Sequence, residues 1–535
     1  MRQNIIIFSI ALSITASAAV PKLNYKQLNS EARKEYLRPL RTDVAWNTFA
    51  KKFLYAPAFH FPERPGARGY LFVLADRQGH RWQMRADSPR ASLSPVWNDI
   101  PAGTDVTLAV MTIDRSGRAT TDTVGRRQFQ RDYPFSGPYA TPARPYREAA
   151  LMAMRYIHGL KAINRWKDHP EPDMSYAHHT YACKIIGATL RNEALVARFF
   201  PELRDEALLV GRHAAEFLRS ISQPEGSPLA YFPPTYYKGL IASARQENQN
   251  KTMCMEAVAV GQGLLDLYSV TRDRWYLDWA LGIADTYVRL QRPDGSLPIK
   301  LDLTTGEPVN SACAMLHPLL RYWLRLHREF GQSRYEAARQ RGQQWMHDVA
   351  IRRFDMTGQF EDCSVLGLQP YENLTNCTAA PYAAYIYDQP GSTAAQLRDA
   401  DDLLRLSEDQ FTHWDIRPWR DGIRPHPTPC VFEQYKYQMS VDASADNVAG
   451  AFLSLYQRTG NRLALAKAMA LTATVVNMQD ACTGLIPTIW GYRRNVNATS
   501  EMWANCNVCS TFLLLRMDQA TGQSGERYEG LNLIY

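Results

Sequence analysis

The stretch RLQRPDGSLPIK (residues 289–300) ends an amphipathic helical pattern in a glycine turn, and four other stretches repeat this arrangement. They are SISQPEGSPLAYFP (220–233), RRFDMTGQFED (352–362), IRPWRDGIRPHP (416–427) and VNMQDACTGLIPTIW (476–490). Their glycines follow one another at intervals of 62 to 69 residues, at Gly226, Gly295, Gly358, Gly422 and Gly484. Each interval has room for two helices and a long loop, so the repeat predicts an array of helical hairpins.

Helical periodicity runs from about residue 145 to the end of the chain and predicts twelve helices, or six hairpins. Their expected ranges are 146–163, 174–193, 203–222, 251–271, 274–292, 309–330, 333–349, 375–388, 394–411, 444–459, 461–479 and 500–516. Six hairpins bury their apolar sides most completely as a closed ring, and an open α-solenoid is the alternative. The connections after the glycine turns are long and polar, whereas those at 270–273 and 457–461 are tight. We therefore expect a binding cleft at the mouth with the long loops.

A different pattern precedes the helices. Short apolar or alternating runs at 70–75, 81–84 and 105–110 are separated by glycine and proline turns. This spacing is typical of an antiparallel β-sandwich, which we place at residues 50–135 and expect to be fibronectin- or immunoglobulin-like. Residues 19–49 form an N-terminal linker segment, and the helical domain takes residues 145–535. We expect the β module to support the helical domain and to carry no chemistry.

The first 18 residues have the pattern of a secretion signal. Arg2 precedes an apolar stretch over 5–14, and Ala16-Ser17-Ala18 forms a cleavage site before Ala19. The apolar stretch is too short to span a bilayer, and no later run reaches about 18 apolar residues. These features predict an exported protein, periplasmic or secreted, with no membrane span.

Composition excludes several function classes. The 535 residues are 45% apolar, and 61 basic against 53 acidic residues give a net charge of +8. Because no run of five like charges occurs, a nucleic-acid partner is not expected. Phosphate-binding, dinucleotide-binding and H-E-x-x-H motifs are absent from the sequence.

The nine cysteines are too sparse for a disulfide framework. Cys506 and Cys509 form a C-x-x-C pair inside a helical pattern, where small buried thiols are the simplest interpretation. A disulfide or a metal site is the alternative, and we expect neither a metal nor a cofactor.

A secretion signal, a small β-sandwich and six hairpins with PDGS-like turns together resemble the six-hairpin glycosidase and polysaccharide lyase superfamily, whose fold is an (α/α)6 toroid. The resemblance covers about residues 50–535 as architecture. Within that superfamily the chain resembles the exported, β-glucuronidase-like members of glycoside hydrolase family 154. The resemblance implies a carbohydrate-active enzyme that degrades acidic, uronate-containing oligosaccharides or polysaccharides.

Polar and aromatic clusters introduce the helices that follow the long loops, and we expect them to line the cleft. Tryptophan and tyrosine rings stack on sugar faces, amides bind hydroxyls, and arginine suits a uronate carboxylate. Helix capping is the competing explanation for residues such as Asn373. The candidate substrate-binding residues are His178, His179, Asn248, Asn373, Tyr435, Tyr437, Trp490, Tyr492, Arg493, Arg494 and Trp503.

Hydrolysis of a glycosidic bond requires two carboxyl groups, about 6.5–9.5 Å apart in an inverting enzyme. The available carboxylates near the long-loop helix starts are Glu247, Glu256, Glu372, Glu433, Asp442 and Glu501. We expect Glu256 and Glu372 to be catalytic, followed by Glu247 and Asp442.

Two other functions fit the same residue types. A lyase would cleave uronate glycans by β-elimination, with His178, His179, Tyr435 or Tyr437 as base and acid and with Asn248, Asn373 or Arg493 neutralising the uronate. A non-catalytic glycan-binding protein would need the aromatic rim without a working acid–base pair.

Overall fold

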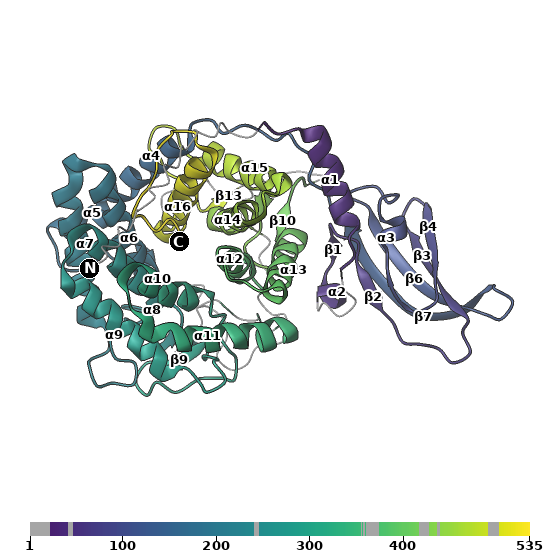
Figure 1. The fold of residues 1–535 in the computed structure, drawn as a ribbon, viewed down its shortest axis with the longest axis horizontal. Helices are drawn as coiled ribbons and strands as arrows, with labels where there is room; N and C mark the ends of the chain where they lie inside the picture. The colour runs from purple at the N-terminus through teal and green to yellow at the C-terminus, as the bar shows by residue number, and fades with distance from the viewer. Residues whose placement is uncertain are drawn as a thin grey trace, which may run out of the picture.

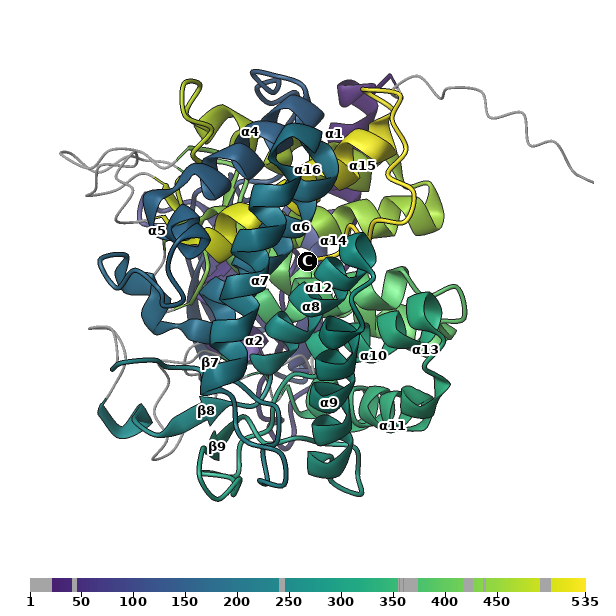
Figure 2. The same cartoon turned by 90° about the vertical axis from the view of Figure 1, so that its left-hand side faces the viewer.

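A computed structural model describes residues 22–40, 46–239, 246–354, 356, 359, 374–416, 427–435, 439–490 and 502–535. Figure 1 shows a ring of helices with a β region at one side, and Figure 2 views the ring from its left-hand end. No helix in the described ranges is both long and apolar enough to cross a membrane.

Twelve long helices of the described chain form the ring in two concentric layers (Figure 1). Each inner helix contacts the next, and α16 returns to contact α6 and α4, so the ring closes and an open solenoid is excluded. The outer helices are α4 (Tyr146–Gly159), α7 (Arg204–Ile221), α9 (Arg274–Leu290), α11 (Glu336–Trp345), α13 (Ala394–Phe411) and α15 (Arg462–Met478). The inner helices are α6 (Ala182–Phe199), α8 (Ala257–Thr271), α10 (His317–Phe330), α12 (Asn376–Tyr387), α14 (Asp442–Thr459) and α16 (Ala504–Thr521).

The two tight connections join an inner helix to the following outer helix. Between α8 and α9, Arg272 adopts a left-handed conformation and the Asp273 side chain caps α9 by accepting from the Trp275 amide. Between α14 and α15, Gly460 and Asn461 play the same two parts. The inner helices therefore run parallel to one another, with their N-termini at the mouth where the long loops gather.

Three inner helices begin later than the helical pattern predicted, at Ala182, Ala257 and His317. The expected starts at 174, 251 and 309 were wrong because these segments satisfy their backbone groups outside an α-helix. The 3₁₀ turn η2 (Ala177–Thr180) precedes α6, and strand β8 (Lys251–Met253) pairs with β9 (Lys300–Asp302) before α8. The polar clusters thus lie in the loops of the mouth.

The β region contains a five-stranded sheet in the order β1-β7-β6-β3-β4 and a two-stranded sheet of β2 and β5. The strands expected at 70–75, 81–84 and 105–110 are present, and the rings of Phe59 and Phe129, from the two sheets, lie 5.7 Å apart. A fibronectin- or immunoglobulin-like classification stays a prediction. The strands are β1 (Lys52–Phe53), β2 (Ala58–His60), β3 (Gly69–Ala75), β4 (Arg81–Ala86), β5 (Arg90–Ser92), β6 (Asp105–Ile113) and β7 (Ala119–Arg131).

Shorter elements complete the chain. Helix α1 (Tyr25–Leu37) contacts both the β region, through α3 (Ser94–Trp97), and the ring, through α15. The others are α2 (Trp46–Phe49), α5 (Lys161–Asn164), η1 (Arg165–Lys167), η3 (Pro201–Leu203), η4 (Gln246–Asn248), η5 (Ser333–Tyr335), the π-helical η6 (Met346–Ile351), β10 (Thr412–His413), β11 (Cys430–Val431), β12 (Ser440–Val441) and β13 (Ile489–Trp490).

Candidate functional site

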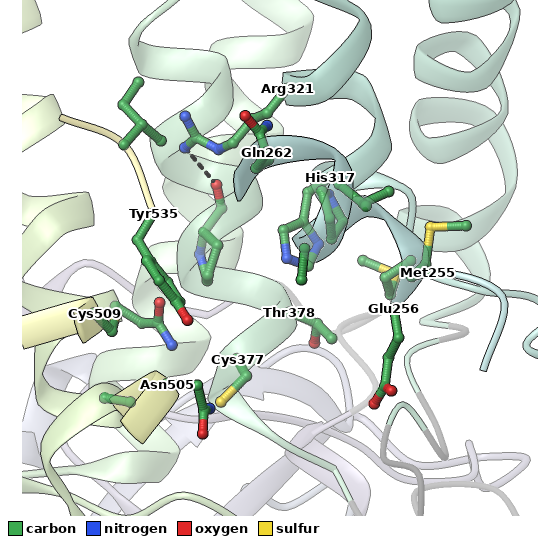
Figure 3. A pocket seen from close by; sticks show the side chains of 18 of the residues that line it. Met255, Glu256, Gln262, His317, Arg321, Cys377, Thr378, Asn505, Cys509 and Tyr535 are labelled. Atoms are coloured by element: carbon green, nitrogen blue, oxygen red, sulfur yellow. Dashed lines mark hydrogen bonds between the residues drawn. The ribbon is translucent and has the colours of Figure 1, made fainter. Parts of the chain in front are cut away.

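A cavity of about 590 Å³ occupies the centre of the ring and is lined by residues from all six inner helices. Figure 3 shows side chains that project into it from several helices. Its wall runs from the helix starts at the mouth, where Lys184 and His317 lie, to later turns such as those of Arg191 and Arg328. Lys184 and Arg191 belong to α6, and His317 and Arg328 belong to α10. At a rise of about 1.5 Å per residue, the spacing within each pair places the deep end roughly 10–16 Å below the mouth.

Two glutamates line the mouth end of the cavity. Glu256 precedes the first turn of α8 and is half-buried. Glu433 lies in the segment before α14, where its amide donates to the Met439 carbonyl (3.0 Å) and its carbonyl accepts from the Asn376 amide (3.3 Å). Glu256 is at the start of α8, whereas the Glu433 backbone is bonded to the first residue of α12, so the two residues come from different walls of the ring. Two carboxyl groups held in this way can act as an acid and a base on a molecule bound between them.

His317, the first residue of α10, lies between these walls and lines the cavity, as does Gln262 of α8 (Figure 3). Burial, together with the positive charge of Arg321, lowers the pKa of His317 to about 3. The His317 Nδ1 atom is buried and has no hydrogen-bond partner in the described part of the chain. A neutral imidazole at this position offers one donor and one acceptor to a bound ligand.

Three thiols line the wall formed by α12 and α16. Burial raises the pKa of Cys377 to about 12, and it raises the pKa values of Cys506 and Cys509 well above the ordinary range. These cysteines are therefore neutral thiols and poor nucleophiles. The C-x-x-C pair consists of buried thiols, as predicted. No three histidine, cysteine or acidic side chains of the described residues gather as metal ligands.

Ion pairs fill the deep end of the cavity. Arg191 and Arg325 each lie 2.7 Å from a different oxygen of Asp266. Arg321 lies 3.3 Å from Asp388 and also donates to the Pro381 carbonyl at 3.0 Å (Figure 3). These pairings fix the guanidinium groups, so the deep end is a rigid polar surface.

Of the predicted site residues that the structure describes, Glu256 lines the cavity and the others do not. Six predicted residues lie outside the described residues: Glu372, Asn373, Tyr437, Tyr492, Arg493 and Arg494. Glu247 belongs to η4, away from the cavity lining. Asp442 begins α14 but is fully buried behind the wall, beside Asp446.

Several predicted binding residues have structural positions instead. Trp490 is fully buried, and its indole nitrogen donates to the Pro487 carbonyl at 2.7 Å, so it offers no stacking surface. Asn248 is buried and accepts from Lys300 Nζ at 2.6 Å. The Tyr435 hydroxyl accepts from the Lys51 amide at 3.3 Å, joining the ring to the segment before β1.

The histidine pair and Trp503 form a cluster beside the mouth. His179 is buried, with Nδ1 2.8 Å from the Asp173 carbonyl, and burial lowers its pKa. His178 stacks on Trp503 at 4.1 Å between ring centres. Trp503 in turn lies 5.7 Å from the ammonium group of Lys184, which does line the cavity. His178 and Trp503 thus adjoin the lining residue Lys184 without lining the cavity themselves.

The sequence contained weak signals for the residues that were missed. Glu433 was among the available carboxylates, and His317 starts a helix after a long loop, as the predicted clusters do. Nothing in the sequence signalled that residues 531–535 would return to line the cavity.

The chain was compared with known protein families, curated proteins and solved structures. No protein-family model matches the chain, and no curated protein matches it in sequence. Similar solved structures include a family 76 glycoside hydrolase from Bacteroides thetaiotaomicron, 12% identical with a TM-score of 0.45 over 84% of this chain and 93% of that one. A cellobiose 2-epimerase from Spirochaeta thermophila is 10% identical, with a TM-score of 0.44 over 70% of this chain and 98% of its own. An unsaturated glucuronyl hydrolase specific for heparin is 10% identical, with a TM-score of 0.44 over 70% of this chain and 97% of its own.

Proposed function

We propose that this protein is a carbohydrate-active enzyme that hydrolyses glycosidic bonds in acidic, uronate-containing oligosaccharides or polysaccharides. The observation that carries the proposal is the pair of glutamates, Glu256 and Glu433, on different walls of one cavity. One carboxyl group protonates the leaving glycosidic oxygen, and the other carboxylate takes a proton from the water that attacks the anomeric carbon. In this proposal Glu433 is the second catalytic carboxyl group beside Glu256, the role that we expected from the sequence for Glu372.

An acidic substrate is supported by the electrostatics of the mouth. Six parallel inner helices direct their N-termini toward it, and a helix N-terminus favours negative charge. Lys184 adds a cation to the lining at the same level. A uronate carboxylate would be attracted by both.

Elimination is less well supported than hydrolysis. His178, His179 and Tyr435, which we predicted as acid and base for a lyase, are absent from the cavity lining. His317 does line it, but with a pKa near 3 it is a weak base for removing a carbon-bound proton.

The test is incubation of the purified protein with a panel of uronate-containing oligosaccharides, followed by mass analysis and ultraviolet absorbance of the products. Hydrolysis adds one water per bond cleaved and creates no chromophore. An unsaturated, absorbing product would establish elimination instead, and binding without any product would indicate a glycan-binding protein.

Glu256→Gln and Glu433→Gln should each lower kcat by at least about 100-fold with a small change in KM, because each removes one proton-transfer group. Glu247→Gln is the matched control, since Glu247 lies near the mouth but outside the cavity lining. Full activity of Glu433→Gln would remove Glu433 from the mechanism and return attention to Glu372.

We also propose that the protein acts outside the cytoplasm, on the basis of the signal pattern in residues 1–18. N-terminal sequencing of the protein recovered from its native host should give Ala19 as the first residue. Recovery of an intact Met1 chain from the cytoplasmic fraction would contradict this.

A further inference from the structure

The segment Leu531–Tyr535 lies at the deep end of the cavity, and four of its residues beside Tyr535 itself contribute to the lining. Figures 1 and 2 both place the C-terminal end of the chain among the inner helices. Side chains of the ring hold the segment there. Asn532 Nδ2 donates to Glu329 Oε1 at 2.8 Å, and the Ile534 carbonyl accepts from Arg191 Nη2 at 2.9 Å.

Arg191 fixes the position of the Tyr535 ring. Its guanidinium group lies 4.8 Å from the centre of the Tyr535 ring and 4.1 Å from that of Phe512, while Asp266 anchors the same guanidinium at 2.7 Å. The Tyr535 ring also lies 5.7 Å from Phe512.

Tyr535 nevertheless keeps part of its surface open to the cavity. The residue is 41% exposed although it lines an interior cavity, and Figure 3 shows its ring reaching into that cavity toward Cys509. An aromatic ring that is held by neighbouring side chains and lines a mixed polar and apolar cavity is suited to the apolar face of a sugar ring.

From these contacts we infer that the segment Leu531–Tyr535 closes the deep end of the cavity and that Tyr535 is the stacking platform for the terminal sugar of the substrate. The inference rests on the proposed function and specifies it further. A cavity that is closed at one end admits a chain end and no through-going polymer, so the enzyme removes sugars stepwise from one end of an acidic glycan. Arg191 and Asn532 are positioning residues for this closure.

The test uses an end-labelled acidic hexasaccharide as substrate and compares the full chain with Tyr535→Ala, Tyr535→Phe and a chain that ends at Gly530. The full chain should release a single short product from one end throughout the reaction. Tyr535→Ala should lower kcat/KM roughly tenfold by removing the stacking surface, while Tyr535→Phe, which keeps the ring, should stay within about twofold. The shortened chain should yield internal cleavage products because its cavity is open at both ends.

Glu526→Gln, an exposed change just before the segment, is the control and should leave the product pattern unchanged. Internal products from the full chain at early times, or equal losses in Tyr535→Ala and Tyr535→Phe, would overturn the inference while leaving hydrolysis intact. If the shortened chain fails to fold, the comparison of the two Tyr535 variants still decides. If the full chain neither cleaves nor binds any glycan, the proposed function is overturned, and the inference is overturned with it.

Discussion

Two buried carboxyl groups beside the cavity, those of Asp442 and Asp446, have raised pKa values. Asp442 and Asp446 are one turn apart on α14 and both are buried. Burial, and then the neighbouring Asp446 carboxyl, raise the pKa of Asp442 well above its usual range, although Oδ1 accepts from the Ala443 amide. Burial likewise raises the pKa of Asp446, whose Oδ2 accepts from the Ser510 hydroxyl at 2.6 Å. Burial thus favours the protonated form of both carboxyl groups in the folded protein.

This pair should make the fold less stable as pH rises. In the unfolded chain an aspartate releases its proton near pH 3.9, whereas in the folded protein the raised pKa retains it to higher pH. Between these values the folded state binds more protons, so the free energy of unfolding falls with increasing pH. Asp442→Asn should reduce this fall between pH 5 and pH 8 by about 1.4 kcal/mol for each pH unit of that range in which the folded Asp442 stays protonated and the unfolded one is ionised.

Urea unfolding of wild type and Asp442→Asn at pH 5, 6.5 and 8 measures the effect. The exposed Asp87→Asn serves as the control and should follow the wild-type pH dependence. Parallel curves for wild type and Asp442→Asn would mean that the buried pair is not protonated in the folded state.

At the scale of elements, the glycine turns that the structure describes follow the outer helices α7, α9 and α15, and two of them lie against the next hairpin. Gly295, after α9, has φ +91°, and a Cβ atom there would lie 2.3 Å from the Arg341 carbonyl of α11. Gly484, after α15, has φ +86°, and its Cβ would lie 2.5 Å from the Met152 carbonyl of α4. Glycine is therefore needed at these turns both for the backbone conformation and for the close approach of the next hairpin.

Gly226 supplies a matched comparison, because it has φ +87° but no atom within 4 Å of its would-be Cβ. Gly226→Ala should cost about 1–2 kcal/mol of unfolding free energy, the cost of the left-handed conformation alone. Gly295→Ala and Gly484→Ala should each cost at least about 2 kcal/mol more, since backbone atoms must also move. Chemical denaturation measures all three, and similar losses in the three variants would show that close approach between hairpins adds nothing.

The same turns explain how much of the fold was predictable from sequence. Glycine turns at regular intervals and helical periodicity depend on local backbone and packing requirements, so the sequence predicted the hairpins and the closed ring. Helix starts were less accurate, because segments such as Lys251–Met253 pair with a distant strand that local pattern does not reveal.

The site was predicted less completely than the fold. Glu256 was expected at the mouth because it lies at the start of a helix that follows a long loop, and it does line the cavity; its catalytic role stays a prediction. Side-chain direction within a loop depends on tertiary contacts, so Asn248 and Trp490 were assigned to the cleft but are buried elsewhere. Tyr535 is held in the cavity by a cation–π contact with Arg191, which lies far away in the sequence, so local sequence pattern does not predict it.

For the whole molecule, a buried charge cluster joins the ring to the N-terminal part of the chain. Lys467 of α15 lies 2.9 Å from Glu408 of α13 and 3.2 Å from Glu35 of α1. Glu408 is fully buried and also accepts from the hydroxyl groups of Tyr36 (2.6 Å) and Tyr55 (2.7 Å). Burial alone would lower the pKa of Lys467, but Glu35 and Glu408 raise it, so the ammonium group stays charged.

Lys467→Met should therefore destabilise the protein by about 3–5 kcal/mol, because it leaves the Glu408 carboxylate buried without its cation. The double variant Lys467→Met/Glu408→Gln should recover part of this loss, since a neutral amide oxygen still accepts from the two tyrosines. Lys161→Met, at an exposed position, should stay within about 0.5 kcal/mol of wild type. Chemical denaturation gives the four free energies of a double-mutant cycle. Additive losses in the double variant, or a loss below about 1 kcal/mol for Lys467→Met, would mean that this cluster does not hold the β region and α1 against the ring.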